Sequence, residues 1–466
     1  MEITKDIENT LRLLSKANLD FLAFVEKNPV CLKRDNFREL EEMRNKLHFL
    51  QSWPTFLGGE AKKMFREAGV KLFDLIKSIP ERLFQNDTRA MAAYYELPVS
   101  LVDLQMEGIT QGRLDNLLAR GDFILSPQGL KCLEYNVAGI LGGHLLPLWE
   151  SLYLKNPLVL RFLKEYSITI KNKNLLEQYL AHCMRAAEPQ VSRFGDAEIN
   201  IALVLKGDAQ ANLGPMAGYL DKLYRELLQR EYPPQCGNIF LCDFPALDVR
   251  DDSVYYKGRR IHALTEWHFG MVPPRIMKAF KAGNISIMNG PVTGLMSAKS
   301  NLALLSEHKD SGIFNHEEKQ IIEKYVPWTR KITVGETTYR DERIRLADFI
   351  LSHKDEFVIK SSLGLAGDSV YIGKSMSPGQ WEERVKHAVL NKNWVVQEAV
   401  TSSSALYQHG ETGFEVYDMV WGFFIFGSHY AGTFLRVILK KDAPRIVNTH
   451  QGAQVSVVFE VDEEEE

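Results

Sequence analysis

The chain has little of what marks several large classes of protein. Its 466 residues include only five cysteines, an odd number, without CxxC pairs or the Cys and His spacing of a zinc site. We expect these cysteines to be reduced and buried. The longest apolar runs have the length of a strand, and the opening residues show no basic stretch followed by an apolar one. These absences predict a cytoplasmic protein with no membrane span.

Charge of one sign is not in excess. The formal net charge is −4, so no broad positive field favours nucleic acid, although a local basic pocket for a phosphate-bearing ligand is compatible with it. No Ser/His or Cys/His arrangement indicates a covalent nucleophile. With 45% hydrophobic and 25% charged residues the composition is that of a globular protein, and the length predicts two or three packed modules.

Residues 1–100 have helical periodicity. Apolar side chains recur every three or four positions, as in Phe37, Leu40, Met43, Leu47 and Leu50. A second such stretch covers 64–84, and we expect Pro80 to end that helix. The terminal run of acidic residues is expected to be a solvated tail. No chemistry stands out here, so this region is interpreted as a scaffold or lid.

The pattern then changes to alternating strands and helices. After a helical connection, "INIALVLKG" predicts a buried strand, Pro215 opens an amphipathic helix, and "NIFLCDF" predicts another strand. A strand pair turns at Lys257 and Gly258, and "ISIMNG" is a short strand. From 291 onwards come the helical "TGLMSAKSNLALLSEH", the strands "EFVIK" and "NWVVQEAV", and the alternation of an antiparallel sheet.

Polar residues cluster in a hairpin at 121–139. The period of a strand puts Glu134 and Asn136 on one face, and a hairpin brings Asp122 opposite them. Two carboxylates and an amide oxygen suit Mg²⁺ shared with substrate phosphates. Arg120 projects to the same face, where it would stabilise negative charge. The alternative is a solvent-exposed polar hairpin edge.

A strand ending at Lys360 leads into a loop of small residues that contains Gly364, Ala366 and Gly367. Small residues let backbone N–H groups approach phosphate oxygens, and the lysine supplies a compact positive charge. The loop does not match a P-loop, and a plain glycine hairpin is the alternative. Lys299 lies on a predicted first turn of a helix, where a solvated lysine is the alternative.

Together these segments resemble the circularly permuted ATP-grasp enzymes related to the synthetase part of glutathionylspermidine synthetase. "RGD" and "EYNVAG" precede "MSAKSNLALLSE", "FVIKSSLGLAGDSVYIG" and "WVVQEAV", which is the order of that permuted group. The resemblance implies a mixed α+β and α/β fold. It divides the chain into a helical region at 1–100, the metal-binding strands of the ATP-grasp C-lobe at 101–160, a helical connection with a central α/β substrate module resembling a pre-ATP-grasp domain at 161–290, and the remaining ATP-grasp lobes at 291–466.

The resemblance also implies roles for individual residues. Mg²⁺ would be bound by Asp122, Glu134 and Asn136, and the acyl phosphate would lie beside Arg120 and Arg436. ATP would be bound by the two lysines, the loop, the strand that follows and one late residue: Lys299, Lys360, Ser361, Ser362, Gly364, Ala366, Gly367, Gln397, Glu398, Ala399, Val400 and Asn448. Arg436 as an ordinary surface arginine of a strand stays an alternative.

The activity implied is an ATP-dependent carboxylate–amine ligase, with ATP, a carboxylate and an amine as substrates and Mg²⁺ as the metal. A small-molecule kinase on the same fold and a degenerate nucleotide-binding partner protein are the alternatives. Glu266 stands where the family often has arginines, so it would bind an amine or guanidinium, or form an ordinary ion pair. Neither the acid nor the amine is identified by the sequence.

Overall fold

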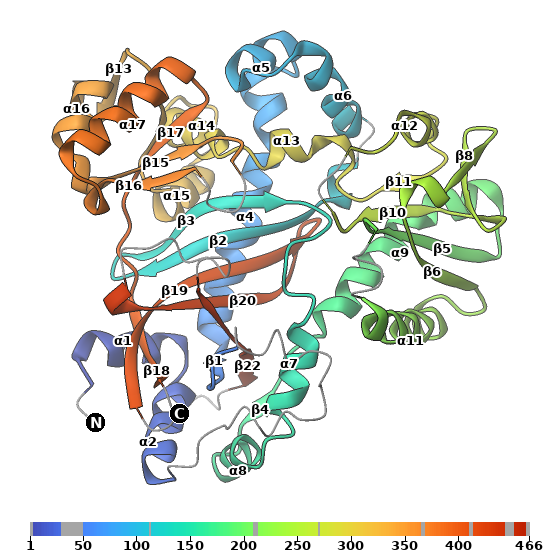
Figure 1. The fold of residues 1–466 in the computed structure, drawn as a ribbon, viewed down its shortest axis with the longest axis horizontal. Helices are drawn as coiled ribbons and strands as arrows, with labels where there is room; N and C mark the ends of the chain where they lie inside the picture. The colour runs from blue at the N-terminus through green and yellow to red at the C-terminus, as the bar shows by residue number, and fades with distance from the viewer. Residues whose placement is uncertain are drawn as a thin grey trace.

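The computed structural model describes residues 3–28, 50–110, 113–207, 213–268, 271–364, 369–409, 413–442 and 452–462. The fold is mixed α+β, with helices packed on several sheets (Figure 1). Its helices are α1 Lys5–Leu14, α2 Lys16–Lys27, α4 Gly59–Phe84, α5 Thr88–Tyr95, α6 Val99–Thr110, α7 Leu146–Tyr153, α8 Pro157–Glu165, α9 Leu175–Phe194, α11 Gly214–Glu231, α12 Pro274–Lys281, α13 Thr293–Met296, α14 Ser300–His308, α15 His316–Tyr325, α16 Leu346–Ser352 and α17 Pro378–Asn391.

The largest sheet joins segments from both halves of the chain. It is antiparallel, in the order β21-β20-β19-β2-β3, with β18 paired to β19. Its strands are β2 Leu118–Ser126, β3 Gly129–Val137, β18 Ser404–His409, β19 Gly413–Phe426, β20 His429–Leu439 and β21 Gln454–Ser456. The predicted hairpin is therefore confirmed as β2–β3, and late strands of the chain extend its sheet.

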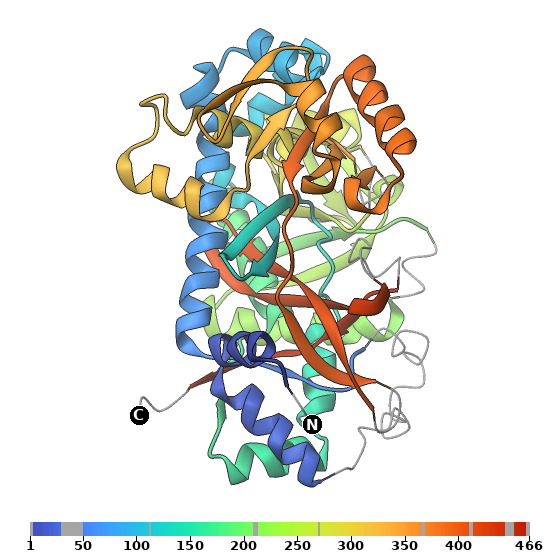
Figure 2. The ribbon, with the colours of Figure 1, turned by 90° about the vertical axis from the view of Figure 1, so that its left-hand side faces the viewer.

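Helix α4 supports the back of this sheet (Figure 2). The ring of Phe65 lies 4.9 Å from that of Trp421 and 4.6 Å from that of Phe423, between centroids. Burial of such aromatic side chains fixes the helix on β19. The prediction that Pro80 ends this helix was wrong, because α4 continues to Phe84. Proline removes a single N–H group, and the last turn is still closed by the amides of Gln85 and Asn86, which donate to the carbonyl oxygens of Glu81 and Pro80.

A second lobe carries the predicted lysine strand. Its antiparallel sheet has the order β12-β17-β15-β16, and α16, α17 and the hairpin β13–β14 lie in the same lobe (Figure 1). Trp381, Ile350 and Phe357 belong to a separate core of this lobe. The strands are β12 Thr329–Lys331, β13 Glu336–Tyr339, β14 Glu342–Arg345, β15 Phe357–Ser361, β16 Val370–Ile372 and β17 Trp394–Glu398. The strands predicted from "EFVIK" and "NWVVQEAV" are confirmed.

The helix predicted at 293–308 is interrupted. It forms α13 and α14, and the break leaves Lys299 at the N-cap of α14. The amide of Lys299 donates to the carbonyl oxygen of Ser362, 2.9 Å away, instead of to its own helix. This bond fixes the lysine against the lobe that carries β15.

The central α/β module is built on a parallel sheet with the order β11-β10-β5-β6. Its strands are β5 Glu198–Val204, β6 Cys236–Cys242, β10 Ala263–Glu266 and β11 Ser286–Ile287, and a small antiparallel sheet adds β7 Asp248–Arg250, β8 Ser253–Tyr256 and β9 Arg259–Arg260. These strands and the turn at Lys257 confirm the predicted pattern. Cys236 is exposed on the edge strand β6, so the expectation that every cysteine is buried was wrong there.

Strand β1 Thr55–Leu57 pairs with β22 Val458–Asp462, which also pairs with β4 Thr169–Ile170. This small sheet ties an early segment to a late one. Across the part of the chain that the structure describes, no helix has both the length and the apolar character needed to cross a membrane. The predicted helix through Phe37 lies outside the described residues, as do Ala366, Gly367 and Asn448. The predicted domain boundaries stay predictions.

Candidate functional site

The β2–β3 hairpin brings four of the predicted site residues into two facing pairs. Asp122 lies opposite Glu134, and Arg120 lies opposite Asn136. The register then shifts, because Phe123 pairs with Cys132. Leu133 is therefore an extra residue, as in a β-bulge, and such a bulge redirects the groups beside it. The period of the strand predicted the shared face of the polar residues but not the bulge.

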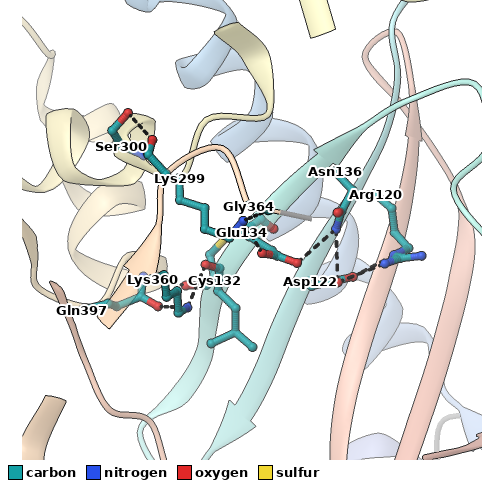
Figure 3. A network of polar contacts seen from close by, with 12 residues as sticks. Arg120, Asp122, Cys132, Glu134, Asn136, Lys299, Ser300, Lys360, Gly364 and Gln397 are labelled. Atoms are coloured by element: carbon teal, nitrogen blue, oxygen red, sulfur yellow. Dashed lines mark hydrogen bonds and ion pairs between the residues drawn. The ribbon is translucent and has the colours of Figure 1, made fainter. Parts of the chain in front are cut away.

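Asn136 links the two carboxylates (Figure 3). Its Nδ2 atom donates to Oδ2 of Asp122 over 3.2 Å and to Oε1 of Glu134 over 3.4 Å. The point between two carboxylates favours positive charge, which the amide hydrogens supply here. Rotation of the carboxamide would put its oxygen at the same point. Two carboxylates and one amide oxygen therefore fit a magnesium ion whose other ligands are water and substrate oxygens.

No set of three or more His, Cys, Asp or Glu side chains placed to hold a metal ion occurs among the described residues. A cation here would thus depend on the smaller set of Asp122, Glu134 and Asn136. Such incomplete protein coordination is typical of Mg²⁺ bound together with phosphates.

Two arginines neutralise Asp122. Nε of Arg120 lies 2.8 Å from Oδ1 of Asp122, and Nη2 of Arg436 lies 2.8 Å from Oδ2. Burial alone would raise the pKa of Asp122, but the charges and hydrogen bonds of Arg120 and Arg436 outweigh it and lower the pKa to about 2. The carboxylate therefore stays ionised in a buried position.

Arg436 is buried, with 7% of its surface exposed, rather than lying on the surface of its strand. Burial lowers the pKa of its guanidinium, and the charge of Asp122 only partly opposes this. Its Nε atom has no hydrogen-bond partner among the described residues. Burial of a cationic N–H group without an acceptor is unfavourable in free energy, unless a ligand oxygen accepts its hydrogen bond.

The two predicted lysines approach the same hairpin, Lys360 from β15 of the second lobe and Lys299 from the start of α14 (Figure 3). Nζ of Lys299 donates to the carbonyl oxygen of Gly364 over 2.7 Å and lies 3.1 Å from Oε2 of Glu134. Nζ of Lys360 donates to the bulge carbonyl of Leu133 over 3.2 Å. Both side chains are buried, which excludes the solvated lysine as an explanation of Lys299.

Lys360 also donates to Oε1 of Gln397 over 2.6 Å. Burial lowers the pKa of Lys360 to about 8, although Glu134 partly opposes the shift. Glu134 itself is held in its charged form, because Lys299 and Lys360 outweigh the effect of burial and lower its pKa. Positive and negative groups of the two lobes thus share one charge network.

Several residues predicted to bind ATP make hydrogen bonds within the protein instead. The hydroxyl of Ser362 donates to that of Ser300 over 2.9 Å, and its amide donates to the carbonyl of Asn393. The amide of Ser361 donates to Ser369. Ser362 therefore joins the lysine strand to the start of α14 and is not free to bind a phosphate through these groups.

Residues of β17 and just after it that were predicted to bind ATP have partners within the protein. Gln397 is buried and accepts a hydrogen bond from Lys360, so it positions the lysine and is not free to bind ATP through this oxygen. The carboxylate of Glu398 accepts hydrogen bonds from Tyr339 and Arg340. The amide of Ala399 donates to the carbonyl of Glu356 over 2.7 Å. After Ala399, Val400 lies half-buried in the connection to β18.

Sequence reasoning missed three backbone groups of the site. Leu133 and Gly364 offer carbonyl oxygens to the two lysines, and Leu141 accepts a hydrogen bond from Nη1 of Arg120. Backbone acceptors carry no side-chain signal, so only the glycines of the loop after β3 hinted at a close approach there.

No family model matches this chain, and no curated protein matches it. Among solved structures, the fold is similar to that of a glutathione synthetase-like effector from Globodera pallida in its apo form, with a TM-score of 0.54. The similarity covers 92% of this chain and 98% of that one, at 10% sequence identity. At this identity the likeness shows the fold alone, which is the mixed α+β architecture described above.

Proposed function

We propose that this protein is an ATP-dependent carboxylate–amine ligase built on a circularly permuted ATP-grasp fold. One observation carries the proposal: Lys299, at the start of α14, and Lys360, on β15 of the second lobe, meet the same hairpin at Glu134 and at the bulge carbonyl of Leu133. Cations suited to phosphates and oxygens suited to Mg²⁺ therefore meet at one place. Phosphoryl transfer from ATP needs this combination. The similarity to a glutathione synthetase-like protein supports a ligase over other uses of the fold.

In this proposal Asp122, Glu134 and Asn136 hold Mg²⁺, which neutralises phosphate charge when it is bound. Lys299 and Lys360 release their present acceptors and contact phosphate oxygens. Ala366, Gly367 and Asn448 stay predictions.

The arginines act on the reacting acid. A carboxylate oxygen of the substrate attacks the γ-phosphorus, the bond to the ADP oxygen breaks, and an acyl phosphate forms. The amine nitrogen then attacks the carbonyl carbon, loses a proton and expels phosphate. Negative charge develops on the carbonyl oxygen during this attack, and the guanidinium groups of Arg120 and Arg436 would stabilise it.

The test is calorimetric titration of a non-hydrolysable ATP analogue, with and without Mg²⁺, into wild type and two variants. Lys360→Met removes the buried cation, and the double variant Glu134→Gln/Asn136→Leu removes metal-binding oxygens. We expect magnesium-dependent binding by wild type, weaker binding by the lysine variant and loss of the magnesium effect in the double variant. Lys309→Met, an exposed lysine paired with Asp310, is the matched control.

Binding in wild type justifies a screen of acid and amine pairs for ADP release. Amide formation with ADP and phosphate supports the ligase. A phosphorylated product formed without an amine would instead establish a kinase, and nucleotide binding without turnover would leave a binding protein. Absence of nucleotide binding by folded wild-type protein contradicts the proposal.

A further inference from the structure

In the central module the carboxyl ends of the parallel strands lie together at one end of the sheet, which we call the module edge. β5 ends at Val204, β10 ends at Glu266, and these two residues are neighbours in the register. In parallel α/β sheets, ligands bind outside the carboxyl ends of the strands. The polar side chains at this edge therefore indicate what kind of ligand it accepts.

Glu266 is half-buried and ends β10. No hydrogen bond or ion pair joins its carboxylate to another described residue, and burial raises the pKa of Glu266 to about 7. A carboxylate partly removed from water without a partner is unfavourable for the protein alone. A cation at this position would restore the lost stabilisation.

Asn289 supplies a second, independent observation at the same edge. It follows β11, which pairs with β10 through Leu264 and Ile287, so it lies as far beyond this pair as Glu266 does. It is 5% exposed, and its Oδ1 atom accepts a hydrogen bond from the amide of Leu118 over 2.6 Å. Its Nδ2 atom has no partner among the described residues. The ends of β10 and β11 thus carry a buried donor without a partner and a half-buried carboxylate without a partner, as expected of a site that takes a polar ligand.

This edge adjoins the reaction site through the loop after β3. A Cβ atom at Gly139 would lie 2.0 Å from the backbone oxygen of Glu266, so the loop lies directly against β10. Two residues later, Leu141 accepts a hydrogen bond from Arg120. Because two extended residues span at most about 7 Å, β10 and Arg120 contact the same short segment of this loop.

We propose that Glu266 binds an ammonium or guanidinium group of a substrate, and that Nδ2 of Asn289 donates to an oxygen of the same molecule. This inference rests on the proposed ligase, for which it names a cationic substrate and a specificity-determining residue. The charged group is held at the module edge, while another part of the substrate reaches the acyl phosphate beside Arg120. Glu266 thus selects the substrate by charge and takes no part in bond making.

The test uses methylguanidinium and its neutral isostere N-methylurea, so that shape is constant and charge differs. Full-length protein labelled with 5-fluorotryptophan is titrated at constant ionic strength, and the ¹⁹F signal of Trp267, assigned with Trp267→Phe, is followed. We expect a saturable shift with methylguanidinium and none with N-methylurea. Glu266→Gln should weaken the response at least tenfold. Glu198→Gln, at the amino-terminal end of β5, should retain the response to methylguanidinium.

An equal response to both probes, an unchanged response in Glu266→Gln or no response in wild type overturns the inference. Glu266→Gln is expected to fold, because it removes a partly buried carboxylate without a partner. The ATP analogue is titrated into the same samples. If nucleotide binds and charge selectivity is absent, only this inference fails, whereas absence of nucleotide binding removes the proposed function.

Discussion

Nζ of Lys299 lies 3.1 Å from Oε2 of Glu134, so a cation suited to phosphate pairs with a carboxylate suited to a metal. Lys299 lies at the start of α14 and Glu134 lies on β3, and their ion pair occupies both charged groups. ATP and Mg²⁺ would each take one partner of this pair. In the proposed ligase, the affinity for nucleotide would therefore depend on the free energy needed to separate Lys299 from Glu134.

This relationship predicts opposite effects of Glu134→Gln with and without Mg²⁺. In EDTA the variant should bind an ATP analogue more tightly than wild type, on the order of tenfold, because Lys299 is released and a negative charge near the phosphates is lost. With Mg²⁺ the variant should show no further gain. Calorimetric titration measures both effects, with Glu323→Gln, an exposed partner of Lys309, as control. Unchanged affinity in EDTA would contradict the role of the pair.

Asp122→Asn should destabilise the fold by about 3–5 kcal/mol at pH 7, since two buried guanidinium groups lose their shared anion. The pKa of Asp122 is lowered to about 2, so its stabilising effect is complete above about pH 4 and is lost as the pH falls through 2. The difference in unfolding free energy between wild type and variant should narrow over this range. Urea denaturation at several pH values measures it. A difference independent of pH below 4 would be inconsistent with this assignment, and Asp310→Asn is the exposed control.

Lys360 should also make the unfolding free energy rise with pH, but over an alkaline range and because its charged form is the unfavourable one. Because its folded-state pKa is lowered to about 8, burial of its charge costs stability fully below pH 8, and this cost is relieved as the pH rises toward about 10.4. Relative to Lys360→Met, wild type should gain up to about 3 kcal/mol of unfolding free energy between pH 7 and 10. Urea denaturation across this range tests the trend.

Gln397 provides a specific check on the same lysine. Gln397→Glu places a carboxylate where Oε1 now accepts a hydrogen bond from Lys360, so the lysine should stay protonated to higher pH. The rise in unfolding free energy should therefore begin at least one pH unit higher than in wild type. The measurement is the same series of urea denaturations. An unmoved transition would show that Gln397 does not govern the state of Lys360.

The sequence predicted the parts of this site that depend on local periodicity. Glu134 and Asn136 share a face because strands have a period of two, and Lys360 stands at a strand end because an apolar run stops there. The role of Ser362 was not predictable, since its hydroxyl suits a phosphate as well as Ser300, a residue 62 positions away that packs against it only in the folded chain.

The bulge at Leu133 was equally invisible in the sequence. A bulge arises where one strand's pairing with its neighbour shifts register, and the residue itself is an ordinary leucine. The break at Lys299 also depends on a distant carbonyl, that of Ser362. Local patterns thus place side chains on faces, whereas long-range backbone pairing decides which groups they meet.

Gly139 is expected to be the least tolerant glycine between the hairpin and the central module. In Gly139→Ala the new Cβ atom would lie 2.0 Å from the backbone oxygen of Glu266, a contact that requires the backbone of the loop or of β10 to move. Such overpacking should cost about 1–3 kcal/mol of unfolding free energy. Gly218→Ala is the matched control, because Gly218 is exposed within α11 and no atom lies within 4 Å of its added Cβ. It should be neutral or stabilise by up to about 1 kcal/mol. Equal unfolding midpoints in urea for the two variants would show that the loop does not pack against Glu266.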